Sequence, residues 1–202
     1  MSENRGIKVV LLGEAGVGKT NLIRVAMGKS FETNINSTLA SSFYEAQINV
    51  NDKIYQYYLW DTAGQEVYRC VNKIFIKDSK VVIIVFAINN RESFNNVDFW
   101  INYVKEILDD DTYILALVGN KGDLYDDQEI SDEEMDKKAK SFGIKFKITS
   151  AATDAQGFKT FLNELLEEYI VKYKPEETSV SDSFMIKNKK HKKKKDNESK
   201  CC

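Results

Sequence analysis

The chain has 202 residues, a hydrophobic content of 43% and a formal net charge of −2. This length allows one globular domain with or without a tail, and the composition is apolar enough for a sizeable core. The single histidine, His191, lies in a lysine-rich segment, which excludes catalytic triads and zinc sites that depend on histidine.

Charge is distributed unevenly along the chain. Residues 186–202 contain eight lysines and two acidic residues, a local charge of +6, which leaves −8 for residues 1–185. An acidic domain argues against nucleic acid as its partner, whereas the basic tail suggests a separate anionic surface as its target.

Cysteine content and hydropathy indicate the cellular compartment of the protein. One internal cysteine, Cys70, cannot build a disulfide framework, and the N-terminus has no apolar signal region. The longest apolar runs, such as residues 81–88, are too short to span a bilayer. We therefore expect a cytosolic protein.

Apolar runs predict the strands. Near-continuous runs at residues 7–12, 81–86 and 113–118 are typical of strands buried on both faces of a parallel sheet, and a short strand is predicted at 145–149. Alternation over residues 44–50, the turn signal Asn51-Asp52 and the run 53–60 predict a hairpin.

Helical spacing predicts the intervening elements. A helix is predicted from the end of the first turn to about Met27-Gly28, and apolar residues recur at helical spacing from 94 to 108. Ser131 and Glu134 fit a capping box at the start of a polar helix over 131–142, and a last helix covers about 158–169. Residues 29–41 and 61–78 show no clear period and are predicted to be irregular.

The alternation of strands and helices predicts an α/β fold with a doubly wound, mostly parallel six-stranded sheet. We assign this domain to residues 6–174. Pro175 follows the last helix, and residues 175–202 are polar, lysine-rich and without apolar period, so we expect a disordered tail.

The motif that organises the domain is Gly13-Glu14-Ala15-Gly16-Val17-Gly18-Lys19-Thr20, between the first strand and the first helix. In this context G-x-x-x-x-G-K-[S/T] predicts a phosphate-binding loop, whose backbone N–H groups surround an anion at the positive end of the helix. Lys19 adds a charge against the terminal phosphates, and the Thr20 hydroxyl can ligate Mg²⁺. The alternative is an ordinary glycine-rich turn, which the Lys-Thr pair disfavours. Nucleotide contacts are expected from Gly13, Ala15, Gly16, Val17, Gly18, Lys19, Thr20 and Asn21.

A second motif, residues 61–66, directly follows the strand that ends at Trp60. The Asp61 carboxylate can hold Mg²⁺ directly or through a water. The Gly64 N–H can approach a terminal phosphate, and Gln65 can orient an attacking water. On its own this segment could be a plain loop that begins with an aspartate.

A third motif, Asn120-Lys121-Gly122-Asp123, follows the strand at 113–118. The Asp123 carboxylate can accept two hydrogen bonds from guanine, whereas adenine would leave a buried carboxylate unpaired, at a cost of several kcal/mol by order of magnitude. The aliphatic stem of Lys121 can lie on the base. Ser150 and Ala151 end the next strand, where a backbone N–H can meet the guanine carbonyl.

These motifs, in this order and spacing, resemble those of the Ras superfamily of small GTPases over about residues 6–172. The Trp60–Glu66 sequence with a terminal Cys201-Cys202 is similar to the Rab branch, and residues 37–43 resemble the first switch of endosomal Rabs. The resemblance implies that Thr38 binds Mg²⁺ and the γ-phosphate, and that Phe31 stacks on guanine. It also implies an aromatic effector surface made of Phe43, Trp60 and Phe75.

The resemblance implies a monomeric switch that binds GTP or GDP with Mg²⁺ and regulates vesicle trafficking. Hydrolysis would use Gln65, Lys19 and Thr38, with metal ligands Thr20, Thr38 and Asp61. We see no arginine that could act as a finger in cis, so unaided turnover should be slow. The implied partners are an exchange factor, a GTPase-activating protein, an escort protein, a GDP-dissociation inhibitor and effectors.

The C-terminal pair Cys201-Cys202 resembles a doubly geranylgeranylated Rab end. Together with the lysines at 192–195 it predicts anchoring to the cytoplasmic face of intracellular membranes. The alternative is an unmodified cysteine pair on a solvated tail.

Two rival functions remain open. Ala15 and an unusual second switch after Gln65 favour a module of the same fold that binds GTP and scarcely hydrolyses it. A nucleotide kinase would need arginine-rich lid segments, whereas this chain has four scattered arginines: Arg5, Arg24, Arg69 and Arg91.

Overall fold

The computed structural model describes residues 6–33, 42–61, 69–108 and 112–176. Its six-stranded sheet has the order β2-β3-β1-β4-β5-β6, and β2 and β3 form the one antiparallel pair. The strands are β1 (Ile7–Leu12), β2 (Ser42–Val50), β3 (Lys53–Asp61), β4 (Val81–Ala87), β5 (Ile114–Asn120) and β6 (Lys145–Ile148). The predicted α/β fold with a mostly parallel six-stranded sheet is confirmed.

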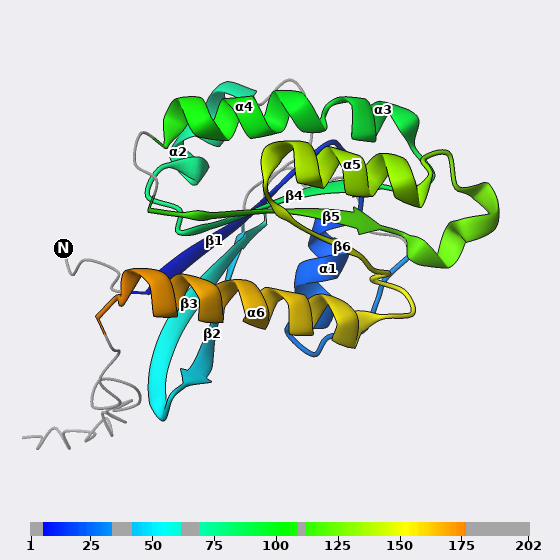
Figure 1. The fold of residues 1–202 in the computed structure, drawn as a ribbon. Coiled ribbons are helices and arrows are strands. Elements are labelled where there is room, and N and C mark those ends of the chain that lie inside the picture. Colours follow the sequence, from blue (N-terminus) through cyan, green and yellow to red (C-terminus); the bar gives the residue numbers. More distant parts are fainter. Residues whose placement is uncertain (1–5, 34–41, 62–68, 109–111, 177–202) are drawn as a thin grey trace, which may run out of the picture.

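Helices cover both faces of the sheet (Figure 1). On one face lie α1 (Lys19–Ala26) and α6 (Ala155–Tyr173), and on the other lie α2 (Arg69–Ile76), α3 (Arg91–Asn95), α4 (Val97–Ile107) and α5 (Asp132–Phe142). A 3₁₀ helix, η2 (Gly122–Asp127), follows β5. Among the described residues, no helix is long and apolar enough to cross a membrane.

The two cores follow from the alternation of side chains along the strands. In β1, Val9 and Leu11 pack in the core that includes Phe158 of α6, whereas Val10 and Leu12 pack in the core that includes Trp100 of α4. Since β1 is covered on both faces, its sequence is apolar from Val9 to Leu12. The same reasoning explains β4 and β5, which are buried throughout.

One prediction of local structure is wrong. Residues 61–78 were expected to be irregular, but α2 spans Arg69–Ile76. Its sequence is strongly amphipathic, with Val71, Ile74 and Phe75 at helical spacing, although Ile74 is 73% exposed. The helix has only eight residues, which is shorter than the window over which a helical period is recognised in sequence.

Two further expectations about helices have clear outcomes. The stretch 94–108 is divided at Asn96, which caps both α3 and α4. The capping box at the start of α5 is confirmed, because the Ser131 side chain and the Glu134 side chain each accept the predicted backbone hydrogen bond.

Candidate functional site

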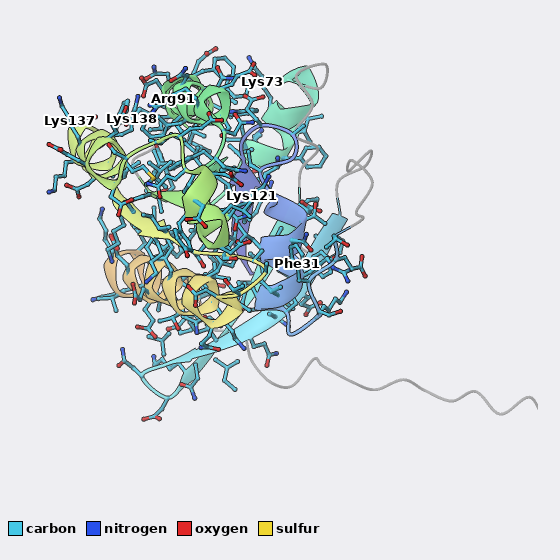
Figure 2. The ribbon with its side chains drawn as sticks, turned by 90° about the vertical axis from the view of Figure 1, so that its right-hand side faces the viewer. Phe31, Lys73, Arg91, Lys121, Lys137 and Lys138 are labelled. Carbon is cyan, nitrogen blue, oxygen red and sulfur yellow. The ribbon has the colours of Figure 1, made fainter. Side chains whose placement is uncertain are left out.

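The predicted motifs meet at one edge of the sheet. Because β1, β3, β5 and β6 run parallel, their carboxyl ends lie at the same edge. The loop after β1, Asp61 of β3, Asn120 of β5 and the Thr149-Ser150-Ala151 segment after β6 therefore come together. Figure 2 is viewed from this side, and in it Phe31 and Lys121 lie on the face turned toward the reader.

Glycine is required at two positions of the loop between β1 and α1. Gly13 has φ 135°, and a Cβ there would lie 2.0 Å from the Val85 carbonyl oxygen. Gly18 has φ 97°, and a Cβ there would lie 2.3 Å from Asn120 Nδ2. Both the backbone conformation and the close neighbours exclude a side chain at these positions.

Lys19 begins α1 and is only 5% exposed. Its Nζ donates to the carbonyl oxygens of Gly13 and Glu14, each at 2.8 Å. Since an ammonium group carries three N–H donors, one remains for a ligand. Burial lowers the pKa of Lys19 to about 8, while the negative charges of Asp61 and Glu14 oppose that shift.

Asp61 and Thr20 face each other beside Lys19. The Thr20 side chain hydrogen-bonds to Asp61, which is 1% exposed. Burial raises the pKa of Asp61, and the Thr20 hydrogen bond and the Lys19 charge partly offset the rise. Within the described residues, Asp61 Oδ1 is buried without a hydrogen-bond partner.

A buried carboxylate oxygen without a partner is costly, and a bound cation removes that cost. Mg²⁺ prefers oxygen ligands, and it is commonly bound by one or two carboxylates together with phosphate oxygens. A hydroxyl and a carboxylate in contact at the end of a phosphate-binding loop fit this ion. Thr20 and Asp61 are therefore suitable residues to hold it, as the sequence predicts.

Asn120 joins three segments of the site. This residue is 2% exposed, and its Nδ2 donates to the Val17 carbonyl oxygen at 2.7 Å. Its Oδ1 accepts a hydrogen bond from the Ala151 N–H at 3.1 Å. The amide thereby fixes the phosphate loop relative to the loop after β6. Sequence reasoning placed Asn120 at the nucleotide but missed this cross-link, because the partners are 103 and 31 residues away.

Asp123 lies at the rim of the site. Its Oδ1 accepts a hydrogen bond from the Ser150 hydroxyl at 2.5 Å, and the Gly122 N–H donates to the Thr149 carbonyl oxygen at 2.9 Å. Asp123 is exposed, although a buried carboxylate was expected at this position. In this position the carboxylate is accessible to a ligand. Lys121 precedes the turn with φ 65°.

The three aromatic residues of the predicted surface lie in contact next to Asp61. Phe43 of β2 lies 5.3 Å from Trp60 of β3, and Trp60 lies 5.8 Å from Phe75 of α2, between ring centroids. Phe43 is 55% exposed, and the Lys8 ammonium lies 5.2 Å from the Trp60 ring centroid. The structure brings together the three residues that the resemblance identified.

Several predicted residues lie outside the described residues. Thr38, Gly64 and Gln65 belong to residues 34–41 and 62–68, and Cys201 and Cys202 belong to residues 177–202. Their roles stay predictions.

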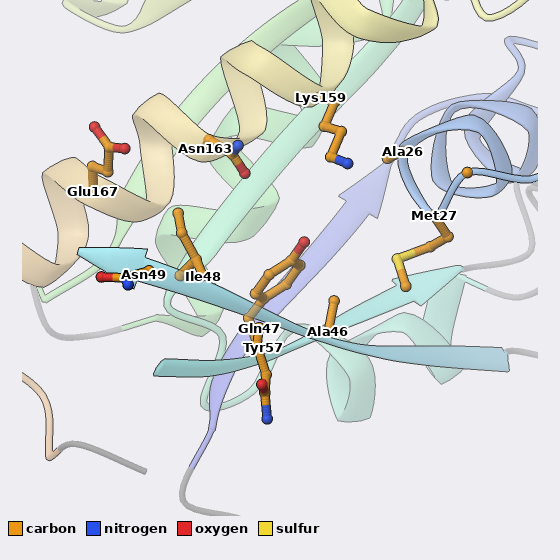
Figure 3. Close-up of a pocket in the computed structure, with 11 residues that line it drawn as sticks. Ala26, Met27, Ala46, Gln47, Ile48, Asn49, Tyr57, Lys159, Asn163 and Glu167 are labelled. Carbon is orange, nitrogen blue, oxygen red and sulfur yellow. The ribbon is translucent and has the colours of Figure 1, made fainter. Parts of the chain in front are cut away.

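A separate groove of about 430 Å³ lies between the end of α1, the β2–β3 hairpin and α6 (Figure 3). The Tyr57 ring stands in it with its hydroxyl directed toward α6. Burial raises the pKa of Tyr57. No predicted nucleotide-binding residue lines the groove, so it is distinct from the site above. Its lining residues are Ala26, Met27, Gly28, Ala46, Gln47, Ile48, Asn49, Tyr57, Lys159, Asn163 and Glu167.

Comparison with known families agrees with this geometry. The family model described as Ras family matches residues 8–170. This range includes all six strands, apart from the first residue of β1, and it includes α6 as far as residue 170. The phosphate loop, Asp61, the Asn120–Asp123 segment and Ser150 all lie within the match. The chain therefore belongs to the Ras family, the small GTPases that act as GTP-binding switches.

Proposed function

We propose that this protein is a Rab-like switch that is recruited to membranes, alternates between GTP-bound and GDP-bound forms, and regulates vesicle trafficking. The observation that carries the proposal is the arrangement around the phosphate loop. There, the buried Lys19 and the Thr20–Asp61 pair meet at the start of α1, and Asp61 Oδ1 has no hydrogen-bond partner among the described residues. Asn120 links that loop to the exposed rim where Asp123 can read a guanine.

The proposed reaction is the hydrolysis of GTP to GDP and phosphate. Water attacks the γ-phosphorus, the bond to the β–γ bridging oxygen breaks, and the proton lost by the water is carried away on the phosphate product. Gln65 would orient the water, and Lys19 and the loop N–H groups stabilise negative charge on the phosphates. Mg²⁺ held by Thr20, Thr38 and Asp61 would supply positive charge to the same oxygens.

Switching is expected to depend on the γ-phosphate. Thr38 and Gly64 would contact it and would release both switch segments after hydrolysis. While the γ-phosphate is bound, effectors would read the neighbouring surface of Phe43, Trp60 and Phe75, where the aromatic rings lie in contact. An exchange factor and a GTPase-activating protein would set the rates.

Membrane recruitment is proposed to use two geranylgeranyl groups on Cys201 and Cys202, with an escort protein and a GDP-dissociation inhibitor handling the lipidated form. Two lipids give a durable anchor, and the adjacent lysines add attraction to an anionic leaflet. Deletion of both cysteines should abolish recovery of the protein with cellular membranes while GDP binding is retained. Unchanged recovery would contradict the lipid anchor.

A second candidate is a GTP-binding module that scarcely hydrolyses its nucleotide. Ala15 favours it, because this exposed residue of the phosphate loop carries a methyl group where Ras proteins have glycine. A methyl there could crowd the attacking water or an incoming arginine.

Single-turnover hydrolysis separates the two candidates. GTP-loaded protein is incubated with saturating Mg²⁺ and phosphate release is measured for the parent, Gln65→Leu and Ala15→Gly. The switch predicts slow release by the parent, on the order of 10⁻⁴ to 10⁻³ s⁻¹, slower release by Gln65→Leu and equal or faster release by Ala15→Gly. A parent rate near background that Gln65→Leu does not lower would favour the binding module.

A further inference from the structure

The phosphate loop contains an acidic side chain at a place that must receive a polyphosphate. Glu14 is the residue after Gly13, and its backbone carbonyl oxygen accepts a hydrogen bond from Lys19 Nζ at 2.8 Å. A carboxylate next to bound phosphates would repel them, and the repulsion is strong where water is partly excluded. The direction in which the Glu14 side chain lies therefore affects nucleotide binding.

The side chain of Glu14 is held by a residue far away in sequence. Trp100 Nε1 donates a hydrogen bond to Glu14 Oε1 at 3.1 Å, across a separation of 86 residues. Trp100 belongs to α4, so the carboxylate is directed toward that helix. The bond joins a neutral donor to a charged acceptor, a class that is stronger than bonds between neutral groups.

Trp100 is well suited to fix the position of its partner. It is 2% exposed and packs in the core between the sheet and α4. The rings of Phe99 and Tyr103 contact it in edge-on geometry, with centroids at 5.4 and 6.3 Å. The indole N–H can only donate, so it selects an acceptor and cannot adapt to another kind of group.

We propose that Trp100 is a positioning residue of the nucleotide site, which holds the Glu14 carboxylate on the α4 side of the phosphate loop and away from the bound phosphates. Glu14 is then fixed at both ends, its backbone by Lys19 and its side chain by Trp100. The inference rests on nucleotide binding at this loop. Loss of the indole N–H frees the Glu14 carboxylate to approach the phosphates. The repulsion lowers the affinity for a triphosphate more than the affinity for a diphosphate, because the triphosphate carries more negative charge.

The test is a set of four proteins: the parent, Trp100→Phe, Glu14→Gln and the double variant. Dissociation of fluorescently labelled GDP and of a labelled non-hydrolysable GTP analogue is followed after addition of excess unlabelled nucleotide. Trp100→Phe should release GDP about tenfold faster, because the released Glu14 charge repels the nearby phosphates, and it should release the GTP analogue faster still. Glu14→Gln keeps an oxygen acceptor without the charge and should release GDP no faster than the parent.

The double variant distinguishes positioning from packing. If Trp100 acts by restraining the Glu14 charge, Trp100→Phe with Glu14→Gln should return to within about twofold of the parent. If the double variant releases GDP as fast as Trp100→Phe alone, the effect comes from the space left in the core, and the proposal is overturned. Phe99→Leu perturbs the same aromatic cluster without removing the N–H, and it should leave both dissociation rates near those of the parent.

A second measurement leaves Trp100 in place, so it tests the proposal even if Trp100→Phe does not fold. The indole N–H resonance of Trp100 should exchange slowly with solvent in the parent, and Glu14→Ala should shift it and accelerate its exchange. An indole resonance that Glu14→Ala leaves unchanged would overturn the proposal. A parent that binds no labelled GDP would instead refute nucleotide binding itself, which is a separate outcome.

Discussion

On the proposed phosphate side of the site the charged groups are buried within the protein, whereas on the proposed base side the Asp123 carboxylate is exposed. Lys19 and Asp61 are 5% and 1% exposed, but Asp123 lies at the surface beside Ser150. Burial of a charge is costly before any ligand arrives, so the phosphate side is arranged for a ligand that brings opposite charges and a cation. The base side becomes desolvated only when a base covers it.

From this difference we infer which residues should control affinity and which should control base selectivity. Changes on the phosphate side should weaken every nucleotide, since all of them carry phosphates. Changes on the base side should alter which base is preferred, because a misplaced donor or acceptor is penalised only in the complex. Asn120 connects the two sides through Val17 and Ala151, so its own substitution should affect both.

The largest effect is expected at Lys19. Lys19→Met removes the buried ammonium that faces the phosphates and should weaken GDP and GTP binding by roughly 100-fold or more. Lys137→Met is the matched control, because Lys137 is exposed on α5. Equilibrium titration with labelled nucleotides measures both. A Lys19→Met protein that binds within tenfold of the parent would contradict the arrangement on the phosphate side.

Asp123→Asn should change the preferred base. The amide cannot accept from guanine in the same way, but its N–H₂ can pair with the additional carbonyl of xanthine. We expect GDP binding to weaken by roughly 10- to 100-fold and xanthosine diphosphate binding to improve. Asp126→Asn, three residues along the same exposed segment, serves as the control. Retention of parental GDP affinity would show that Asp123 does not read the base.

Thr20→Asn should discriminate between the two nucleotides. The Thr20 hydroxyl contacts Asp61, and it is a proposed ligand of the metal that bridges two phosphates. We expect GTP affinity to fall by about tenfold and GDP affinity by less, measured at saturating Mg²⁺. Equal losses for the two nucleotides would count against Thr20 as a direct metal ligand.

The smallest effect is expected for the exposed ion pair of Arg91 and Glu134, which serves as a comparison for the buried charges of Lys19 and Asp61. Arg91 Nη1 donates to Glu134 Oε1 at 2.6 Å. This ion pair, together with the hydrogen bonds that Glu134 accepts from Ser131, lowers the pKa of Glu134 to about 2. A lowered carboxyl pKa stabilises the fold above the unfolded value of 4.5, and the stabilisation is lost as the pH falls toward 2. Glu134→Gln keeps the capping geometry and should lower the melting temperature by only a few degrees at pH 7, and by less at pH 3. A difference that grows toward pH 3 would contradict this assignment.

Much of the fold could be predicted from sequence, because its determinants are local. Near-continuous apolar runs predict β1, β4 and β5, and the Ser131–Glu134 spacing predicts the start of α5. The helix α2 was missed because its eight residues are fewer than the window over which a helical period is recognised in sequence.

The site was predictable to the extent that its motifs are contiguous. The loop from Gly13 to Thr20 and the position of Asp61 are confirmed as neighbours. The hydrogen bonds from Asn120 to Val17 and from Trp100 to Glu14 join residues 103 and 86 positions apart, and no local pattern contains that information. The exposure of Asp123 likewise depends on how the loops after β5 and β6 meet.

The central claim is that the two sides together form a site for guanine nucleotide. The most direct test is thermal unfolding of the nucleotide-free protein with saturating Mg²⁺ and either GDP or ADP, because a ligand that binds only the folded state raises the melting temperature. GDP should raise it by several degrees, and ADP at the same concentration should leave it unchanged. Equal shifts with GDP and ADP, or no shift with GDP, would contradict guanine recognition at this site.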